Sequence, residues 1–305
     1  MIQSNYHFLY INNFKLWGAE VLDYRTKTFL TLCEEMNYRK TAEKLNMTQP
    51  GVTQHIHLLE REYGCSLVSY NGKTLTLTAE GKLLRTHLLQ VMYNENWLRQ
   101  EFSAAKMPTL RIGATKSIGD YMIAPDLIKL IRSGEFTVDL SIDNTQNLLE
   151  NLEQGKMDFA MIEGDFDKTR WGSRKMWSEP FCGICAINHP FAGKTVLIEQ
   201  LLSQHLLLRE TGSGTRAIFE AGMNALGYRI DSFHKVNNIS SFYVLRELIA
   251  QSDAISFGYS SVIKGDHRLS NFTVEGFPNT HDLYYVYQKN TYAETLLKKY
   301  LEIIK

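Results

Sequence analysis

The chain has 305 residues, of which 44% are hydrophobic and 22% charged, so it can bury sizeable cores and is expected to form about two or three domains. Its formal net charge is zero, so no overall positive field points to a nucleic-acid partner, and any such binding has to come from a local arrangement of residues. No apolar run approaches the roughly 18 residues that a membrane-spanning helix needs, which argues against an integral membrane protein.

Four cysteines in a chain of this length do not make a disulfide framework, as expected for a protein of the reducing cytoplasm. Cys182 and Cys185 have the spacing of a redox or metal pair. However, they lie in "EPFCGICAI", which is typical of a strand, where residues three apart point to opposite faces. No second pair completes a zinc site, so we predict neither a metal nor a cofactor.

Residues 1–20 have neither the basic start, apolar centre and small-residue cleavage site of a secretory signal nor a clean helical period. We therefore expect an extension that lies outside the fold, for example one that follows from a misplaced start codon.

The next part of the chain predicts three helices and a hairpin. Apolar residues recur at helical spacing over 22–36, a second short helix follows over 39–46, and a third is expected from Thr48, a good N-cap, to about Tyr63. Gly64 ends the third helix, and apolar and polar residues then alternate on both sides of Asn71-Gly72, a strong hairpin signal. Three helices and a hairpin indicate a winged helix-turn-helix, in which the third helix enters the major groove of DNA.

The third helix has an apolar side and a polar side. Val52, Ile56 and Leu59 are spaced i, i+4 and i+7 and would anchor the helix to its own domain. The polar side would face DNA, where glutamine can bond adenine and threonine can contact phosphate or the thymine methyl group. The predicted DNA-binding residues, including cations of the second helix and the wing, are Arg39, Lys40, Thr48, Gln49, Pro50, Thr53, Gln54, His57 and Lys73.

A long helix is predicted from Ala79 to about Ala105, and such a helix with an apolar stripe is a candidate dimer helix. Pro108 ends it, which gives a DNA-binding domain over 21–80, a linker helix over 81–107 and a third region over 108–305. In that region short β-rich runs alternate with helical stretches, which indicates an α/β fold with parallel strands and ligands at their carboxyl ends. The β-rich runs are 109–115, 136–142, 158–164, 181–187, 205–210 and 254–260, and the helical stretches are 146–154, 215–226 and 241–250.

The segment "FLTLCEEMNYRKTAEKLNMTQPGVTQHIHLLEREYG", with the wing residues Leu67, Leu77-Thr78 and Gly81, resembles the LysR-type transcriptional regulators. The resemblance extends from about Leu22 to the end of the chain. It implies a winged helix, a dimerising linker helix and a two-lobed effector domain like the periplasmic solute-binding proteins. The lobes would be 109–182 with 285–305 and 183–284, with hinges at Cys185 and Tyr285.

Some positions depart from the family pattern. The family often has arginine at the position of Gln54, a second basic residue at His57, and phenylalanine and arginine at Val68 and Tyr70. Fewer cations mean fewer phosphate contacts, so we expect DNA binding with a shallow salt dependence.

The segment "RETGSGTRAIFEAG" places two glycines and several hydroxyls before a helix that would start near Arg216, an arrangement that suits an anion. The resemblance implies that an effector lies between the lobes and touches this loop together with the loops after the first two strands. Lys116 beside several hydroxyls then favours a small anion, a carboxylate or an inorganic oxyanion. The predicted effector-binding residues are Thr115, Lys116, Ser117, Asn144, Thr145, Thr211, Gly212, Ser213, Gly214 and Thr215.

The expected function is therefore effector-controlled, sequence-specific DNA binding in the cytoplasm. Expected partners are double-stranded promoter DNA, the effector, a second copy in a homodimer or homotetramer, and RNA polymerase if the protein activates transcription. A solute-binding protein is the first alternative, but it would not need a winged helix. An α/β enzyme is the second, but the sequence has no Gly-x-Ser-x-Gly elbow, no His-Glu-x-x-His helix, and no ligand spacing among its nine histidines beyond His55-Ile-His57.

Overall fold

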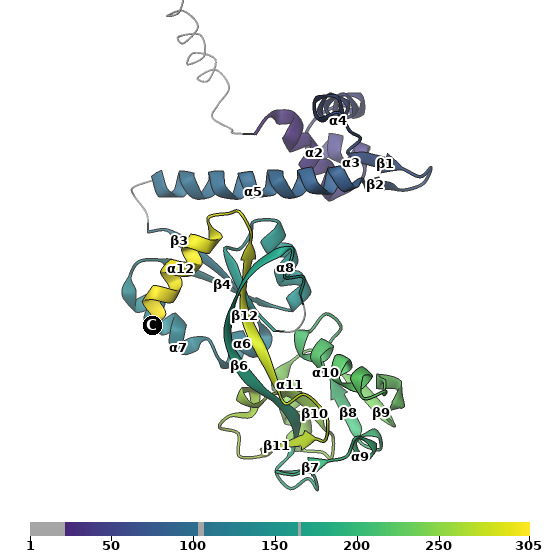
Figure 1. Ribbon diagram of the computed structural model, residues 1–305, viewed down its shortest axis with the longest axis vertical. Coiled ribbons are helices and arrows are strands. Elements are labelled where there is room, and N and C mark those ends of the chain that lie inside the picture. Colours follow the sequence, from purple (N-terminus) through teal and green to yellow (C-terminus); the bar gives the residue numbers. More distant parts are fainter. Residues whose placement is uncertain (1–21, 103–106, 164–165) are drawn as a thin grey trace, which may run out of the picture. The chain divides into compact units, whose positions relative to one another are not determined.

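The computed structural model describes residues 22–102, 107–163 and 166–305, which divide into two compact units on either side of residue 103 (Figure 1). The extension expected over residues 1–20 lies outside the described residues. In the part of the chain that is described, no helix has both the length and the apolar character needed to cross a membrane.

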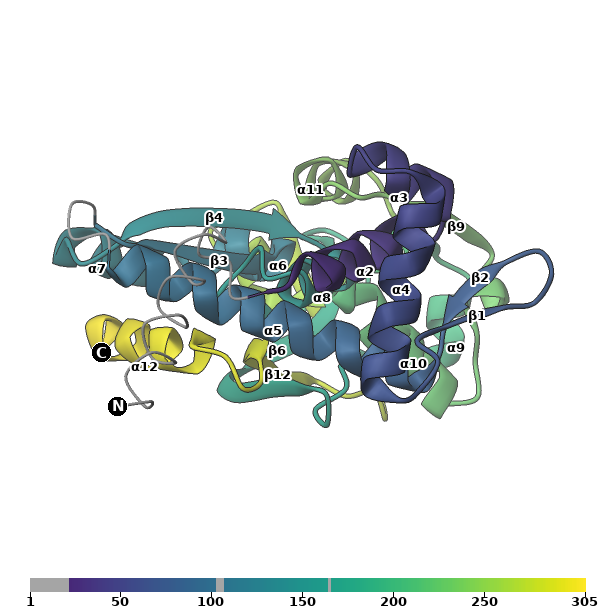
Figure 2. The same cartoon turned by 90° about the horizontal axis from the view of Figure 1, so that it is seen from above.

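The first unit begins with the three predicted helices, α2 (Tyr24–Glu35), α3 (Tyr38–Lys44) and α4 (Gln49–Tyr63). The Thr48 side chain accepts a hydrogen bond from the Gly51 N–H at 3.2 Å and so caps α4, while Gly64 ends the helix with a φ of 68° that favours glycine. Helix α4 packs against α2 and α3 (Figure 2). Their shared core contains Phe29, Leu32, Ile56, Leu59 and Leu67.

The predicted wing is present as β1 (Val68–Tyr70) paired antiparallel with β2 (Leu75–Leu77). The Asn71 side chain accepts hydrogen bonds from the N–H groups of Lys73 and Thr74, at 3.2 and 2.8 Å. The turn therefore occupies residues 71–74 rather than Asn71-Gly72 alone, because the asparagine side chain organises a longer loop.

Helix α5 (Ala79–Phe102) follows the wing, and its described length fits the predicted linker helix. Leu84 and Leu88 belong to the core of the first unit, whereas Leu83 and Phe102 are 73% and 76% exposed. The helix therefore carries apolar side chains that its own unit does not cover.

The second unit is built on one mixed sheet with the strand order β4-β3-β5-β12-β6-β11-β7, in which β10 also pairs with β6. Lobe I holds the parallel strands β3 (Thr109–Thr115), β4 (Thr137–Asp143) and β5 (Phe159–Ile162). Strands β12 (Thr280–Gln288) and β6 (Trp171–Ala186) are antiparallel to each other, and β12 is antiparallel to β5. The helices of lobe I are α6 (Lys116–Tyr121), α7 (Ala124–Ser133), α8 (Thr145–Glu153) and α12 (Ala293–Ile304), and α12 packs against α7.

Lobe II lies at the other end of β6 and β12 (Figure 1). Its strands are β7 (Thr195–Val196), β8 (His205–Leu208), β9 (Lys235–Asn238), β10 (Ser256–Tyr259) and β11 (Leu269–Val274), of which β8 and β9 form a separate parallel pair. Its helices are α9 (Ile198–Leu202), α10 (Gly214–Ala225) and α11 (Phe242–Ala250), with short 3-10 turns η1 (Ile230–Ser232) and η2 (Ser260–Ile263).

The chain passes from one lobe to the other along β6 and β12, but the crossing points are not the expected hinge residues. Cys185 pairs with Ser270 inside lobe II, and Tyr285 pairs with Met161 inside lobe I. The β6–β12 ladder is irregular between Asp282 and Tyr284, opposite 175–178. The chain therefore crosses between the lobes near these residues. This part of β6 is polar, and its sequence did not predict a strand.

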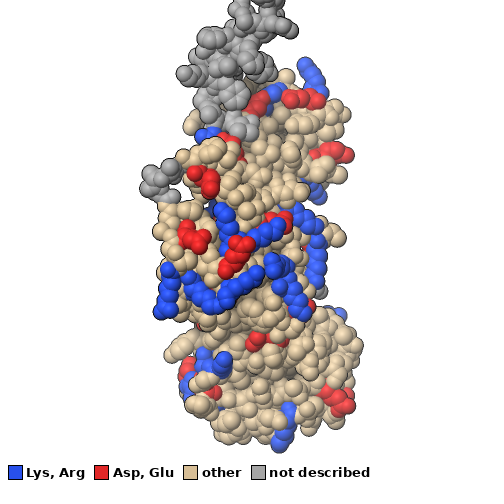
Figure 3. Space-filling model, turned by 60° about the vertical axis from the view of Figure 1, so that its left-hand side comes forward, with Lys and Arg blue, Asp and Glu red and all other residues tan. Residues whose placement is uncertain are grey.

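The zero net charge conceals local concentrations of charge. On the face in Figure 3, many lysine and arginine side chains lie close together, with acidic side chains among them. Exposed cations of lobe I include Lys129, Arg132, Arg174, Lys298 and Lys299. These five residues belong to the second unit, so they do not describe the charge of the helix that is predicted to bind DNA.

Candidate DNA-binding face and effector site

The polar side of α4 forms one continuous surface. A hollow of about 670 Å³ lies on it, lined by Gln49, Pro50, Thr53, Gln54, His57, Leu58 and Arg61. Five of these residues are among the predicted DNA-binding residues. Arg61 was not predicted, although it follows His57 by four residues and so shares its helical face.

Local contacts prearrange parts of this surface. The Thr53 hydroxyl donates to the Gln49 carbonyl at 3.1 Å, and His57 Nδ1 lies 3.2 Å from Glu60 Oε2. Gln54 is exposed, and Val52, Ile56 and Leu59 on the opposite side are buried. The division into an anchoring side and a free polar side follows the prediction.

The remaining predicted DNA-binding residues do not line this hollow. Thr48 lies at the helix N-cap, where its hydroxyl accepts a backbone N–H. Arg39 and Lys40 are exposed on α3, with Arg39 Nε bonded to Glu43 Oε1 at 2.9 Å, and Lys73 is exposed in the wing turn. The exposed Arg39–Glu43 pair is the kind that contributes little to stability, so a phosphate could replace the carboxylate at small cost.

In the second unit, strand ends of both lobes come together. Strands β3, β4 and β5 are parallel, so their carboxyl ends lie at one edge of the sheet, and the carboxyl end of β8 leads into Arg209 and Glu210. We define the interlobe site by the residues that meet there: Thr115, Lys116, Ser117, Thr145, Glu163, Arg209, Glu210, Gly214 and Thr215.

Glu163, directly after β5, occupies the centre of this site and is buried. Its Oε1 accepts hydrogen bonds from the Ser117 hydroxyl of lobe I at 3.1 Å and from the Thr215 hydroxyl of lobe II at 2.8 Å. Burial raises the pKa of the Glu163 carboxyl above its ordinary value, and the Thr215 and Ser117 hydroxyls oppose that shift. Two hydroxyls predicted to bind an effector anion therefore bind a carboxylate of the protein itself.

Helix α10 approaches Glu163 very closely. It begins at Gly214, before the predicted start near Arg216, and a Cβ at Gly214 would lie only 2.7 Å from Glu163 Cγ and from the Glu163 carbonyl oxygen. The Thr145 hydroxyl also donates to that carbonyl, at 3.4 Å. The backbone of Gly214 is not in the left-handed region, so its φ angle does not require glycine. Glycine is required because a side chain would overlap Glu163.

The charged residues Lys116, Arg209 and Glu210 of the interlobe site are paired, and one of these pairs crosses between the lobes. Lys116 Nζ lies 3.0 Å from Glu210 Oε1, and Arg209 Nε lies 2.9 Å from Glu210 Oε2. The Arg209 guanidinium also stacks 3.8 Å from the Phe242 ring centre. Burial raises the pKa of Glu210, but the bonds to Arg209 and Lys116 outweigh it, so the pKa is below its ordinary value.

The other predicted effector residues lie in the strand ends and loops around this arrangement. Asn144 caps α8 by accepting the Asn147 N–H at 2.9 Å, and Gly212 lies close to Asn144. Thr115 is buried at the end of β3, Ser213 precedes α10 and is buried, and Thr211 is exposed. The sequence did not indicate Glu163, Arg209 or Glu210, although the rule that selects strand ends applies to each of them.

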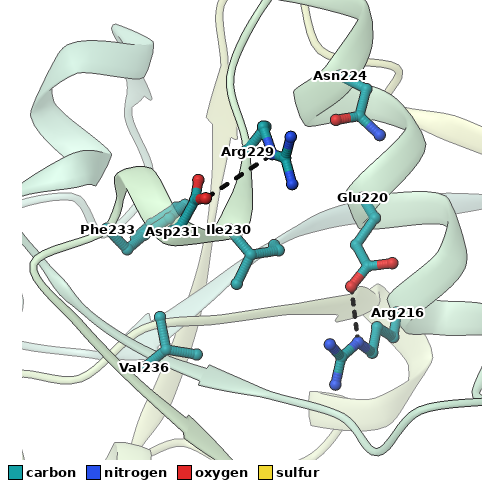
Figure 4. Close-up of a pocket in the computed structure, with 8 residues that line it drawn as sticks. All are labelled: Arg216, Glu220, Asn224, Arg229, Ile230, Asp231, Phe233 and Val236. Atoms are coloured by element: carbon teal, nitrogen blue, oxygen red, sulfur yellow. Dashed lines mark hydrogen bonds and ion pairs between the residues drawn. The ribbon is translucent and has the colours of Figure 1, made fainter.

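A separate pocket of about 680 Å³ lies in lobe II between α10, η1 and β9 (Figure 4). Arg216 and Glu220 form an ion pair at 2.7 Å on one wall, and Arg229 lies 3.8 Å from Asp231 on the other. None of the predicted effector residues lines this pocket.

Cys182 and Cys185 both lie in β6, as predicted for a strand. The Cys182 thiol donates to the Gly258 carbonyl of β10 and the Cys185 thiol to the Ser270 carbonyl of β11, each at 3.7 Å. Burial raises the pKa of Cys182 to about 12 and that of Cys185 to about 11, so both are far from the thiolate form that metals and oxidants require.

Comparison with known proteins agrees with both units. Residues 25–82 match the family model of the bacterial regulatory helix-turn-helix protein of the lysR family, and residues 103–305 match that of the LysR substrate binding domain. The second match alone covers more than half of the chain. The chain is a LysR-type transcriptional regulator.

Individual relatives cover nearly the whole regulator. The transcriptional regulator CysL of Bacillus subtilis is 29% identical over 269 residues, which cover 86% of this chain and 89% of CysL. A full-length OxyR variant from Pseudomonas aeruginosa has the same fold, with a TM-score of 0.61, 18% identity, and coverage of 94% of this chain and 95% of that one. Full-length BenM gives a TM-score of 0.56 with 20% identity, over 92% and 94% of the two chains.

Proposed function

We propose that this regulator recognises promoter DNA through the polar face of α4 and responds to a small anion bound at the interlobe site. Membership of the family makes it a DNA-binding regulator with an effector-binding domain. The residues that contact DNA, the place of the effector and its chemical class are the proposal. Action on chromosomal promoters implies a cytoplasmic protein.

For DNA, the support comes from the side chains of α4. Gln49, Thr53 and Gln54 offer amides and a hydroxyl on one surface, groups that can bond base edges in the major groove. Arg61 and His57 on the same surface, Arg39 and Lys40 on α3, and Lys73 in the wing are then phosphate contacts. The exposed apolar residues of α5 support a dimer through that helix, and a tetramer and contact with RNA polymerase extend the same proposal.

For the effector, one observation carries the proposal: hydroxyls from both lobes bind a single carboxylate group, that of Glu163. Donors arranged for a carboxylate suit a carboxylate or oxyanion effector as well. The glycine at the start of α10 allows a close approach, and Lys116 and Arg209 supply positive charge. An anion that bridges the two lobes would stabilise one lobe arrangement over another, as effector control of DNA binding requires.

The DNA-binding part is tested with the full chain and a duplex that the wild-type protein selects from a random-sequence pool. Gln54→Ala should weaken binding to this duplex about tenfold, since a good base contact is worth ~1–3 kcal/mol, and should leave binding to an unrelated duplex unchanged. Thr137→Ala, an exposed threonine of β4 in the other unit, is the matched control. An equal loss of binding to both duplexes would assign Gln54 no role in specificity.

The effector part is tested by the thermal midpoint of the wild-type chain against a panel of carboxylates and inorganic oxyanions. A ligand of the folded state raises the midpoint in a concentration-dependent way. The shift should be lost in Thr115→Val and kept in Thr137→Val. A shift that survives Thr115→Val together with Ser117→Ala would place the effector elsewhere.

A further inference from the structure

Glu163 has the properties of a ligand rather than of an ordinary buried glutamate. It comes from lobe I, yet one of its carboxylate oxygens accepts hydroxyl hydrogen bonds from Ser117 on α6 and from Thr215 on α10, which belong to different lobes. The two hydroxyl oxygens lie only 3.3 Å apart, so the carboxylate oxygen caps a pair of converging donors. This arrangement matches the way a protein holds a small bound carboxylate.

The fit around the Glu163 side chain is also tight. Gly214 lets the first turn of α10 approach to a distance at which a methyl group would overlap Glu163 Cγ and Thr145 Oγ1, at 2.7 and 2.9 Å. The side chain therefore fills the space between the start of α10 and the carboxyl end of β5. A second anion cannot use the same hydroxyls while the Glu163 carboxylate holds them.

Glu163 nevertheless leaves polar atoms unsatisfied. Its second oxygen, Oε2, and Nη1 of Arg209 are buried, and neither has a hydrogen-bond partner among the described residues. Unsatisfied buried polar groups cost free energy, so the internal carboxylate is an imperfect occupant that a better-fitting anion can replace.

A second internal carboxylate completes the pattern. Glu210 accepts from Arg209 and lies against Lys116, the two cations that would otherwise attract an external anion. Both the hydroxyls and the cations of the interlobe site are thus occupied by carboxylates of the chain. The arrangement joins the lobes through Glu163–Thr215 and Lys116–Glu210 without any added molecule.

We propose that Glu163 is a built-in carboxylate ligand of the interlobe site: it holds the two lobes together in the absence of effector and competes with any external carboxylate for the Ser117 and Thr215 hydroxyls. The inference rests on the proposed anion site and adds its regulation. An effector anion acts by exchanging with Glu163 rather than by filling empty space. The free energy of effector binding is then the difference between the free energies with which the effector and Glu163 occupy the site. This difference lowers the apparent affinity of the wild-type protein for the effector.

The test replaces the tethered carboxylate by a free one. Removal of the side chain in Glu163→Ala leaves the hydroxyl pair open to acetate or formate. In the full-length chain, the thermal midpoint of Glu163→Ala should rise with added sodium acetate or formate, at constant ionic strength kept with chloride, and the apparent Kd should be at least about tenfold lower than in wild type. Glu163→Ala with Thr215→Ala, which lacks one donor, should lose this gain.

Two results would overturn the inference. If acetate and formate stabilise wild type and Glu163→Ala with equal affinity, the hydroxyls are already available in wild type, and the proposed anion site stands without the built-in ligand. If folded Glu163→Ala gains no affinity for either anion, Glu163 does not occupy a carboxylate site. In that case the anion panel on the wild-type chain still decides the proposed effector function by itself.

A second measurement leaves Glu163 in place, so it remains informative if Glu163→Ala does not fold. Thr215→Val keeps the shape of the side chain and removes the lobe II donor. Because this removes one of the links between the lobes, amide hydrogen exchange over residues 211–217 should accelerate about tenfold. Thr137→Val should leave it unchanged, and unchanged exchange in Thr215→Val would contradict the role of Glu163 in joining the lobes.

Discussion

The polar face of α4 and the interlobe site were both predicted to bind a partner, but they differ in what already contacts their polar groups. On α4 the exposed side chains Gln49 and Gln54 border a hollow, and Ile56 and Leu59 on the other side anchor the helix. At the interlobe site Ser117 and Thr215 already hold the carboxylate of Glu163. The exposed polar face of α4 can be inferred from the spacing of residues along one helix. The interlobe site cannot, because its polar groups bond to one another and come from residues far apart in the chain.

The two faces of α4 give the largest expected contrast. Ile56→Ala removes a side chain that is 1% exposed and should lower the free energy of unfolding of the first unit by about 2–5 kcal/mol. Gln54→Ala on the other face should stay within about 0.5 kcal/mol of wild type while it weakens specific DNA binding. Denaturant unfolding and DNA binding of both variants check this, and equal losses of stability would remove the distinction between the two faces.

At the interlobe site, the close approach of α10 gives the next largest effect. A methyl group in Gly214→Ala would overlap backbone and side-chain atoms of Glu163, and overpacking of this kind costs about 1–3 kcal/mol. Gly258→Ala is the matched control, because its Cβ would lie 3.4 Å from Ile184, at ordinary contact. Thermal unfolding should separate the two variants. Similar midpoints would mean that the lobes part at no cost and that the contact with Glu163 is unimportant.

The contrast explains how much the sequence could predict. The helices, their caps at Thr48 and Gly64, the wing and the anchoring residues of α4 follow from local patterns, and all are present. The strands at 109–115 and 205–210 were also located, because short apolar runs of this kind are buried in parallel sheets. Local signals were therefore sufficient for the first unit and for individual buried strands of each lobe.

The long-range parts were not predictable in the same way. The first half of β6 is polar and pairs with β12, more than 100 residues later in the chain, so nothing local marks it as a strand. Glu163 looks like the polar end of an apolar strand, and its partners Ser117 and Thr215 are 46 and 52 residues away. The structure brings the hydroxyls of Ser117 and Thr215 near one another, but the carboxylate that they bind comes from a part of the chain that only the fold places beside them.

Charge on the α4 face offers a smaller effect. Arg61→Ala removes one exposed cation from the lining of the hollow and should weaken binding to every DNA sequence alike, with a decrease of about 1 in the slope of log affinity against log salt. Arg132→Ala in lobe I is the control for the loss of one exposed arginine. A salt series of binding measurements checks this and the shallow overall slope expected from the few cations around α4. A slope as steep as ten phosphate contacts would give contradicts that expectation.

The last prediction concerns the pH dependence of the interlobe site. Because burial raises the folded-state pKa of Glu163 above its ordinary value of 4.5, the folded state binds the Glu163 proton more tightly than the unfolded state. The stabilisation from this group is therefore fully present below the unfolded pKa and is lost as the pH rises through the higher folded pKa. The two hydroxyls and Arg209 reduce this loss because they favour the charged form of Glu163. Burial raises the pKa of the nearby Tyr259 phenol, and the Glu163 charge adds to that rise. Glu163→Gln keeps the size of the side chain but does not titrate, so wild type should lose stability relative to this variant as the pH rises from 4.5 towards neutrality. Thermal midpoints of the two full-length chains across this range measure the difference directly. A difference that stays constant with pH would mean that Glu163 exchanges its proton as freely as an exposed glutamate, which is incompatible with the buried carboxylate that joins the two lobes.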